Sequence, residues 1–216
     1  MNDDCPIAET AAFLPRHATL QTLAASVQKC RGCPLYCHAT QAVFGEGPKR
    51  ARIVLVGEQP GDREDLAGKP FVGPAGRLLD GSLAAAGIDR TRVYVTNAVK
   101  HFKWQLRGTR RLHSRPSWKE TMACKPWLME ELKLIEPALV ICLGATAAQS
   151  LLGKAFRLTA HRREVIKAED GTHVVTTVHP SSLLRIPDRT ARQAARVEFV
   201  ADLAFALKSS RQDSMR

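Results

Sequence analysis

The stretch Ile53-Val-Leu-Val-Gly57 decides how this sequence is expected to fold. Four consecutive apolar residues that end in a glycine are typical of a strand buried on both faces, as in a parallel sheet. Three further apolar runs have the same character and lie at residues 93–96, 139–143 and 174–178. The sequence therefore predicts a sheet of four mainly parallel strands.

Segments with a helical pattern separate these strands, at residues 18–29, 75–87, 117–136, 145–152 and 189–208. Ser117 is a suitable N-cap for the third of these helices, and Pro137 follows its end. Strands that alternate with helices are joined by right-handed crossovers, which cover a parallel sheet on both faces. The predicted fold class is α/β, a three-layer α/β/α sandwich.

The chain has 216 residues, of which 44% are hydrophobic, and this suits one domain with a substantial core. We expect residues 1–16 to form a loose arm, residues 17–208 a single domain, and residues 209–216 a flexible tail. Because the sequence has no long apolar run and no secretory leader, we expect the protein to lie in a bacterial cytoplasm. We also expect it to be a monomer.

Basic residues exceed acidic ones, with 32 Lys and Arg against 21 Asp and Glu and a net charge of +11. They cluster at residues 103–119, 154–167 and 185–196. Clustering of this kind favours a surface for DNA or RNA over charge that only keeps the protein soluble. DNA binding would associate the protein with the nucleoid.

Six cysteines lie at positions 5, 30, 33, 37, 124 and 142. A chain of this length has enough core to fold without a disulfide framework, so we expect free thiols in a reducing compartment. The Cys30-Arg-Gly-Cys33 segment indicates half of a metal or iron–sulfur site, or a redox pair.

Polar groups follow three of the four strands, where ligands of open parallel sheets gather. These groups are Gly57-Glu58-Gln59-Pro60-Gly61, Asn97 and His179-Pro180-Ser181-Ser182. The amide of Asn97 can pair with O4 and N3–H of uracil, whereas cytosine presents the opposite pattern. A turn-forming Asn97 and a core His179 are the alternatives from the residues alone. Glu58 at a buried strand end needs a partner or a chemical task.

Residues 107–114, Arg-Gly-Thr-Arg-Arg-Leu-His-Ser, form a basic segment broken by glycine. We expect it to be a loop in which arginines bind phosphates and His113 lies near a nucleic-acid backbone. A solvated basic loop with an incidental histidine is the alternative.

Four motifs occur in one order: Gly57-Glu-Gln-Pro-Gly61, Gly68-Lys-Pro-Phe-Val-Gly-Pro-Ala-Gly76, Val95-Thr-Asn-Ala-Val-Lys100 and His179-Pro-Ser-Ser-Leu-Leu-Arg185. In order and spacing they resemble the uracil-DNA glycosylase superfamily, specifically its iron–sulfur, family 4 branch. The resemblance covers residues 28–208 and implies the fold of that superfamily, with uracil-containing DNA as the partner.

Two departures from the usual family 4 pattern resemble the UdgX subgroup, which excises uracil and then bonds covalently to the abasic DNA. Gln59 stands where family 4 enzymes usually have alanine, and the Arg-Arg-Leu-His segment at 110–113 is extra. The resemblance assigns the covalent bond to His113. The alternatives are an ordinary multiple-turnover glycosylase that uses water, and a non-catalytic, cluster-bearing DNA-binding module.

The resemblance also implies roles for individual residues. The expected catalytic residues are His113, Glu58, His179 and Gln59. The expected uracil contacts are Asn97, Phe71 and Gly57. The expected DNA contacts are Gly73, Pro74, Gly76, Arg110, Arg111, Ser181, Ser182, Leu184 and Arg185, with Leu183 and Leu184 wedged into the space that the flipped nucleotide leaves.

A [4Fe–4S] cluster is the cofactor that the resemblance implies, and it needs four ligands. Cys30, Cys33 and Cys124 match the family positions, and His101 stands where many relatives have cysteine. Because histidine replaces cysteine on iron in other cluster proteins, these four residues are the expected ligands. Cys37 and Cys142 are rivals for the fourth position, and zinc on the same Cys₃His set is the alternative metal.

Overall fold

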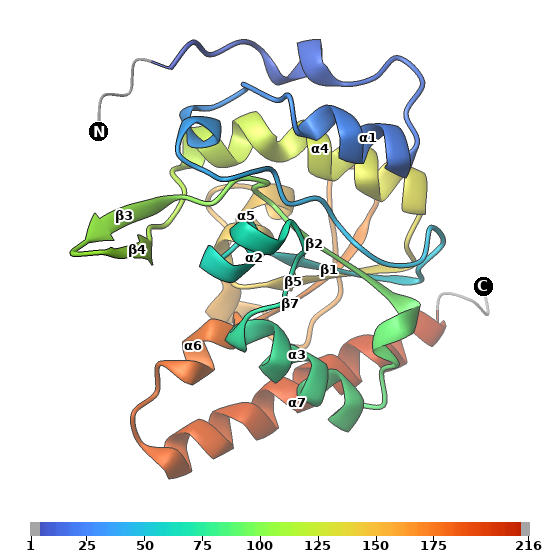
Figure 1. Ribbon diagram of the computed structural model, residues 1–216. Helices are drawn as coiled ribbons and strands as arrows, with labels where there is room; N and C mark the ends of the chain where they lie inside the picture. Colours follow the sequence, from blue (N-terminus) through green and yellow to red (C-terminus); the bar gives the residue numbers. More distant parts are fainter. Residues whose placement is uncertain (1–4, 213–216) are drawn as a thin grey trace.

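The structure is a computed structural model that describes residues 5–212. Its centre is a five-stranded sheet in the order β2-β1-β5-β7-β6 (Figure 1). The strands are β1 (Ile53–Gly57), β2 (Val93–Asn97), β5 (Leu139–Leu143), β6 (Ile166–Lys167) and β7 (His173–Thr177). The four predicted strands pair in parallel, and β6 adds an antiparallel edge. A two-residue strand leaves no periodic signal, so the predicted number of four was one too low.

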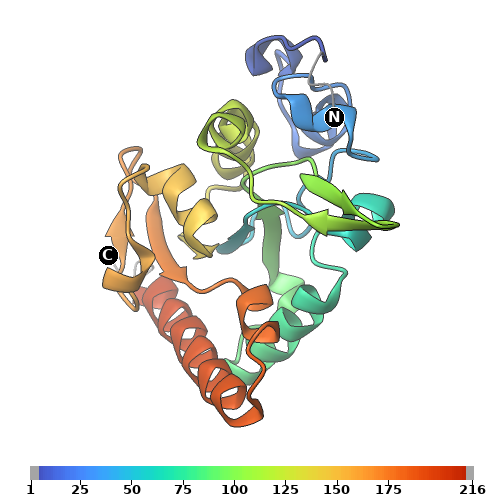
Figure 2. The ribbon, with the colours of Figure 1, turned by 90° about the vertical axis from the view of Figure 1, so that its left-hand side faces the viewer.

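Helices cover both faces of this sheet, which confirms the three-layer α/β/α prediction (Figures 1 and 2). Val54 and Val56 of β1 pack into the core beneath α4 (Trp118–Ile135) and α5 (Ala145–Leu152). Ile53 and Leu55 alternate with them and pack into the core beneath α3 (Pro74–Ala85) and α7 (Arg189–Gln212). The helix α1 (Leu20–Val27) packs against α4. The first apolar run thus supplies both cores, as a strand buried on both faces must.

Two short helices were not predicted, α2 (Asp62–Ala67) and α6 (Pro180–Leu184). Single turns of 3₁₀ helix lie at Thr10–Phe13, Pro34–Cys37, Arg90–Arg92 and Leu158–Ala160. The helix α7 runs past the predicted end at 208, so residues 209–212 of the expected tail are helical, and residues 213–216 lie outside the described part. Between residues 5 and 212, no helix combines the length and the apolar character needed to cross a membrane.

A β-hairpin replaces the loop that was predicted over residues 107–114. Its strands are β3 (Trp104–Arg107) and β4 (Arg110–His113), which pair antiparallel with Trp104 opposite His113. Gly108 in the turn has a φ of 60°, a conformation that favours glycine. The hairpin projects from the body of the molecule (Figure 1). The loop prediction was wrong because four-residue, charged strands do not show the alternation of a half-buried strand.

The N-terminal segment differs from the loose arm that was expected over residues 1–16. Thr10 is buried, and its hydroxyl donates to the carbonyl of Ala123 in α4 at 2.5 Å. The hydroxyl of Tyr36 donates to the carbonyl of Pro6 at 2.8 Å. A Cβ on Gly32 would lie 2.0 Å from the Thr10 hydroxyl oxygen, so the close approach needs a glycine there. Residues 1–4 lie outside the described part.

Cys5 and Cys37 form a disulfide, which contradicts the prediction that all cysteines are free. The other four cysteines, at positions 30, 33, 124 and 142, are free and buried. The prediction rested on chain length. Chain length does not show whether the fold brings two particular thiols, such as those of Cys5 and Cys37, close enough to bond. The bridge joins the N-terminal segment to the turn that follows Cys33.

Candidate active site

A cavity of about 710 Å³ opens at the carboxyl ends of the parallel strands. Nine of the predicted site residues line it, namely Glu58, Gln59, Phe71, Asn97, His113, His179, Ser181, Ser182 and Arg185. They come from the ends of β1, β2 and β7, from the segment before α3, from α6 and its C-terminal end, and from the hairpin. The fold therefore gathers groups that lie far apart in the sequence, at the edge where ligands of parallel sheets bind.

One end of the cavity presents an unpaired hydrogen-bond acceptor. Asn97 ends β2 directly opposite Gly57 of β1, and it is only 3% exposed. Its Oδ1 is buried and has no hydrogen-bond partner among the described residues. A Cβ on residue 57 would lie 2.3 Å from this oxygen and 2.7 Å from Cζ of Phe71, so glycine is needed here. Because an unpaired buried acceptor is unfavourable, the site suits a ligand that brings an N–H donor, such as a pyrimidine imide.

Phe71 provides an aromatic wall beside this acceptor. Its φ is 58°, an unusual conformation for a residue with a large side chain. Gly76 allows it, because a Cβ there would lie 1.6 Å from the Phe71 carbonyl oxygen. The Phe71 and His179 rings are nearly parallel, with centroids 6.3 Å apart. The strained backbone thus presents a flat apolar face to a planar ligand.

His179 is a neutral hydrogen-bond donor. Its Nδ1 accepts the backbone N–H of Ser181 at 3.2 Å, so the ring proton is on Nε2 in the neutral form. Burial lowers the pKa of His179 to about 4, which keeps the ring neutral near pH 7. The Nε2–H group is therefore available to an oxygen of a ligand in the cavity.

Glu58 and His113 meet inside the cavity, with Nε2 of His113 3.2 Å from Oε1 of Glu58. The hydroxyl of Thr146 donates to Oε2 of Glu58 at 2.5 Å. Burial raises the pKa of Glu58, but the hydrogen bonds from His113 and Thr146 outweigh it, so the pKa lies below its ordinary value. An ionised Glu58 thus orients the half-exposed imidazole. Sequence reasoning missed Thr146, since it considered only the glycine at the end of β5 and not the helix that follows.

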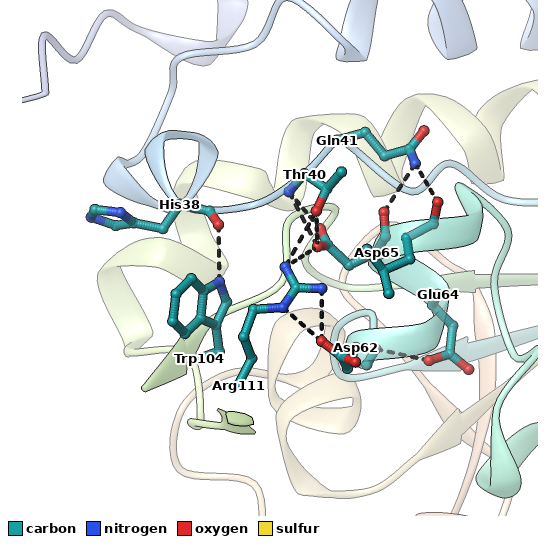
Figure 3. Close-up of polar contacts among 10 residues, drawn as sticks. His38, Thr40, Gln41, Asp62, Glu64, Asp65, Trp104 and Arg111 are labelled. Atoms are coloured by element: carbon teal, nitrogen blue, oxygen red, sulfur yellow. Dashed lines mark hydrogen bonds and ion pairs between the residues drawn. The ribbon is translucent and has the colours of Figure 1, made fainter. Parts of the chain in front are cut away.

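Arg111 holds the hairpin against the body of the protein (Figure 3). Its Nη1 lies 2.7 Å from Oδ2 of Asp65, and its Nε lies 2.7 Å from Oδ1 of Asp62. Asp65 is fully buried and also accepts the hydroxyl of Thr40. Arg111 was predicted to contact DNA, but its guanidinium is bound to two carboxylates of α2. These two aspartates were missed because a six-residue helix gives no periodic signal.

The base of the hairpin is fixed by two further side chains. Nε2 of Gln59 donates to the carbonyls of Lys103 and Ser114, each at 3.1 Å, and its Oε1 accepts the N–H of Lys103. The indole N–H of Trp104 donates to the carbonyl of His38 at 2.9 Å (Figure 3). Gln59 was predicted as a catalytic residue, yet its amide is used entirely to hold the two ends of the hairpin together. These contacts hold the two segments that flank the hairpin, and His113 is the last residue of that hairpin.

Besides the hairpin, two other regions were predicted to contact DNA, and the first is the glycine-rich segment at the start of α3. The N–H of Gly73 donates to Oε1 of Glu64 at 2.7 Å, so this donor is already used. Pro74 opens α3, and Gly76 lies against the backbone of Phe71. These contacts shape the wall that carries Phe71.

The α6 segment is the second predicted DNA-contact region. Ser182 donates to the carbonyl of His179 at 2.7 Å, and Ser181 receives a hydrogen bond from Arg185 at 3.3 Å. Leu184 is 41% exposed beside the cavity. Leu183 is 1% exposed and belongs to the core, so the prediction that it forms part of a wedge is wrong.

A second, small cavity is lined by the four predicted metal ligands, Cys30, Cys33, His101 and Cys124. All four are buried, and Thr10 and Trp127 close the cavity around them. Within residues 5–212, no three His, Cys, Asp or Glu side chains are arranged around one ion position. Three thiols and one imidazole are donors that bind iron–sulfur clusters and zinc alike, so the donor set fits either group.

The sulfurs in this cavity already receive hydrogen bonds. The indole N–H of Trp127 donates to Sγ of Cys30, and the backbone N–H of Lys100 donates to Sγ of Cys124, each at 3.2 Å. The rivals for the fourth position are elsewhere, because Cys37 is bonded to Cys5 and Cys142 packs in the core between β1 and α4.

The chain is similar to known proteins over most of its length. A family model described as the uracil DNA glycosylase superfamily matches residues 44–204. A type-4 uracil-DNA glycosylase of Thermotoga maritima is 40% identical over 172 residues, which cover 79% of this chain and 85% of the relative. A type-4 enzyme of Pyrobaculum aerophilum is 34% identical over 198 residues, 86% of this chain and 92% of the relative. A type-4 uracil-DNA glycosylase of Archaeoglobus fulgidus is 36% identical over 177 residues, which cover 78% of this chain and 85% of the relative.

Proposed function

Because the chain belongs to the uracil DNA glycosylase superfamily, we propose that it excises uracil from DNA and then bonds covalently to the abasic site through His113. One observation carries this proposal. The imidazole of His113 lines the same cavity as Asn97, Phe71 and His179, and it is hydrogen-bonded there to Glu58.

Uracil recognition uses the groups at the strand ends. The target nucleotide leaves the base stack and its base enters the cavity. Oδ1 of Asn97, unpaired in the protein, accepts N3–H of uracil, and the ring of Phe71 stacks on the base. Cytosine has an acceptor at N3, so it would face Oδ1 of Asn97 without a hydrogen bond.

Bond cleavage leaves the electron pair of the glycosidic bond on uracil. The Nε2–H of neutral His179 donates to the uracil oxygen on which this charge develops, and it needs no proton transfer to do so. The sugar becomes cationic at C1′, and the ionised carboxylate of Glu58 stabilises that charge. Uracil leaves as an anion and is then protonated.

The covalent step replaces water with a side chain. A ring nitrogen of His113 supplies its lone pair to C1′ and forms the new C–N bond. The imidazole ring then loses one proton and uracil gains one, so the protons balance and no water is consumed. Glu58 orients the imidazole and balances the positive charge that passes from the sugar to the ring.

Two observations weigh on the alternatives. An ordinary glycosylase would need water at the place where the hairpin brings His113, and Gln59, Arg111 and Glu58 all act to keep the hairpin there. A module that only binds uracil would use the donor and the acceptor, but it would have no use for an ionised carboxylate beside them. The hairpin therefore supports self-trapping over the use of water, and the carboxylate supports catalysis over binding alone.

The cluster proposal is that Cys30, Cys33, His101 and Cys124 hold a [4Fe–4S] cluster. When bound, the cluster supplies a structural link among the turn after α1, the segment after β2 and α4. Purified protein should therefore be brown and contain iron and sulfide. Colourless, fully active protein with stoichiometric zinc would contradict the proposal.

The test of the function compares wild type with His113→Ser on a uracil-containing oligonucleotide. Uracil release and an adduct that survives SDS and heat are measured in the same samples. Wild type should release one uracil per protein and form the adduct. The serine variant should form no adduct, yet release uracil over several turnovers, because water enters where the imidazole lay.

Two results would contradict the proposal. An adduct formed by His113→Ser at the wild-type rate would mean that another residue is the nucleophile. Release of uracil by the wild type over many turnovers without any adduct would favour the ordinary glycosylase. A thymine-containing oligonucleotide of the same sequence serves as the control for substrate.

A further inference from the structure

A fully buried ion pair contacts the backbone of Asn97, and its lysine, Lys100, also lines the second cavity. Lys100 and Glu131 are both 0% exposed, and the ammonium of Lys100 donates to the carboxylate of Glu131. A buried ion pair often gives no more stability than apolar residues of the same volume, since the desolvation of both charges is unfavourable. The pair therefore calls for a reason other than stability.

The ammonium of Lys100 makes two further contacts, and one of them explains the pair. Besides Glu131, it donates to the hydroxyl of Thr96 at 2.7 Å and to the backbone carbonyl of Asn97 at 2.9 Å. All three of its donors are thus used. One of them fixes the peptide group that follows Asn97.

Glu131 anchors this lysine to the frame of the molecule. Its Oε1 accepts the hydroxyl of Tyr94 at 2.8 Å and the N–H of Gly45 at 3.1 Å, and both of its oxygens lie 3.0 Å from the Thr96 hydroxyl. These contacts join α4, β2 and the segment before β1. Because Glu131 is held in this way, the ammonium of Lys100 that binds it is held in place as well.

The opposite side of the same turn is held by β1. The N–H of Ala98 donates to the carbonyl of Gly57 at 2.9 Å, and the N–H of Val99 donates to the carbonyl of Glu58 at 3.0 Å. The peptide between Asn97 and Ala98 is thus held at its N–H by β1 and at its carbonyl by Lys100. With both ends fixed, the backbone at Asn97 cannot rotate.

We infer that Lys100 and Glu131 are positioning residues that set the selectivity for uracil, an inference that rests on the proposed function. They hold the peptide from which the side chain of Asn97 reaches the base, so that its amide stays in register with N3–H and O4 of uracil. When that peptide is free to shift, the two hydrogen bonds to uracil weaken. Cytosine does not make these hydrogen bonds, so the preference for uracil over cytosine decreases.

The test uses a variant that removes both charges at once, K100M/E131Q. The glutamine keeps an oxygen for Tyr94 and Gly45, and no lone charge is left in the core. The matched control is E130Q/K133M, which removes an exposed ion pair from the same helix. Single-turnover uracil release is measured at saturating and at limiting protein, together with release of cytosine and binding to thymine-containing DNA.

We expect K100M/E131Q to lose about 10²-fold in selectivity for uracil over cytosine, the effect of misplacing one recognition group. Binding to thymine-containing DNA should stay at the wild-type level, and E130Q/K133M should match wild type throughout. A folded K100M/E131Q protein with wild-type release and selectivity would overturn the inference. If wild type itself releases no uracil, the proposed function fails instead.

A double-mutant cycle with Asn97→Ala separates positioning from a general structural role. If Lys100 acts through Asn97, K100M/E131Q should cause no further loss of uracil release in the Asn97→Ala background. Losses that simply add would overturn the inference. Should K100M/E131Q fail to fold, Thr96→Val removes one anchor of Lys100 and repeats the cycle. Thr96→Val should lower the selectivity for uracil over cytosine by a smaller factor than K100M/E131Q. In the Asn97→Ala background, Thr96→Val should cause no further loss.

Discussion

The strand ends and the hairpin bring their side chains to one cavity by different means. Asn97 and His179 follow buried parallel strands, so backbone pairing within the sheet fixes where they lie. His113 lies on a two-stranded hairpin outside the sheet, and side-chain contacts at Glu58, Gln59 and Arg111 hold it in the cavity. In the proposed reaction, the sheet therefore positions the groups that recognise the base, and the hairpin positions the nucleophile.

From this difference the proposed reaction predicts that cleavage and trapping are separable. A change at a strand end should affect both steps, because the covalent bond needs an abasic site to form. A change that loosens the hairpin should affect trapping alone. Two substitutions test that division, and two pH-dependent measurements then test the charge states at the strand ends.

Replacing His179 should have the largest effect and should act on both steps. His179→Ala removes the donor to the leaving uracil, so uracil release and adduct formation should fall together by about 10²–10³-fold. Both are followed in single-turnover time courses. If His179→Ala forms the adduct at the normal rate while uracil release is slow, the prediction is wrong, because trapping would then not depend on cleavage.

Loosening the hairpin should act on trapping with little effect on release. Arg111→Leu removes the contacts to Asp62 and Asp65, and adduct formation should fall about 10–10²-fold while uracil release stays near wild type. The matched control is Arg110→Leu in the same strand, which should change only DNA affinity and its salt dependence. Equal losses of release and trapping in Arg111→Leu would show that the hairpin also serves cleavage.

The pH dependence of release should be shallow, because the strand-end groups keep one charge state over a wide range. His179 stays neutral until the pH approaches about 4, and the pKa of Glu58 lies below its ordinary value. Single-turnover release should therefore be flat through pH 6.5 and decline only in more acidic solution. A decline centred near 6.5, the ordinary value for histidine, would mean that His179 is protonated in that range.

The lowered pKa of His179 should also make the free energy of unfolding depend on pH, and this is the smallest of the expected effects. Unfolded His179 takes up a proton near pH 6.5, whereas the folded residue does so only near 4. The unfolded state therefore binds more protons between these values, and the free energy of unfolding should decrease as the pH falls through that window. Urea denaturation of wild type and of His179→Gln should converge toward the acidic end. Parallel curves would contradict the shift.

The sequence predicted the sheet well, because buried parallel strands leave a strong apolar signal and end at a common edge. For the same reason Glu58, Asn97 and His179 were expected near one another, and all three line one cavity, while their roles stay predictions. The roles of Arg111 and Gln59 could not be predicted, since an arginine in a basic segment gives no sign that two aspartates of α2 will bind it. Lys100 and Glu131 are 31 residues apart, and no spacing rule joins them.

The most direct test of the central claim is to locate the covalent bond. The wild-type protein is mixed with a uracil-containing oligonucleotide, the adduct is digested with protease and nuclease, and the peptides are sequenced by tandem mass spectrometry. The account predicts a deoxyribose fragment on His113, with the glycosidic bond to uracil lost. A sugar attached to any other residue, or peptides without a sugar under conditions in which uracil has been released, would contradict it.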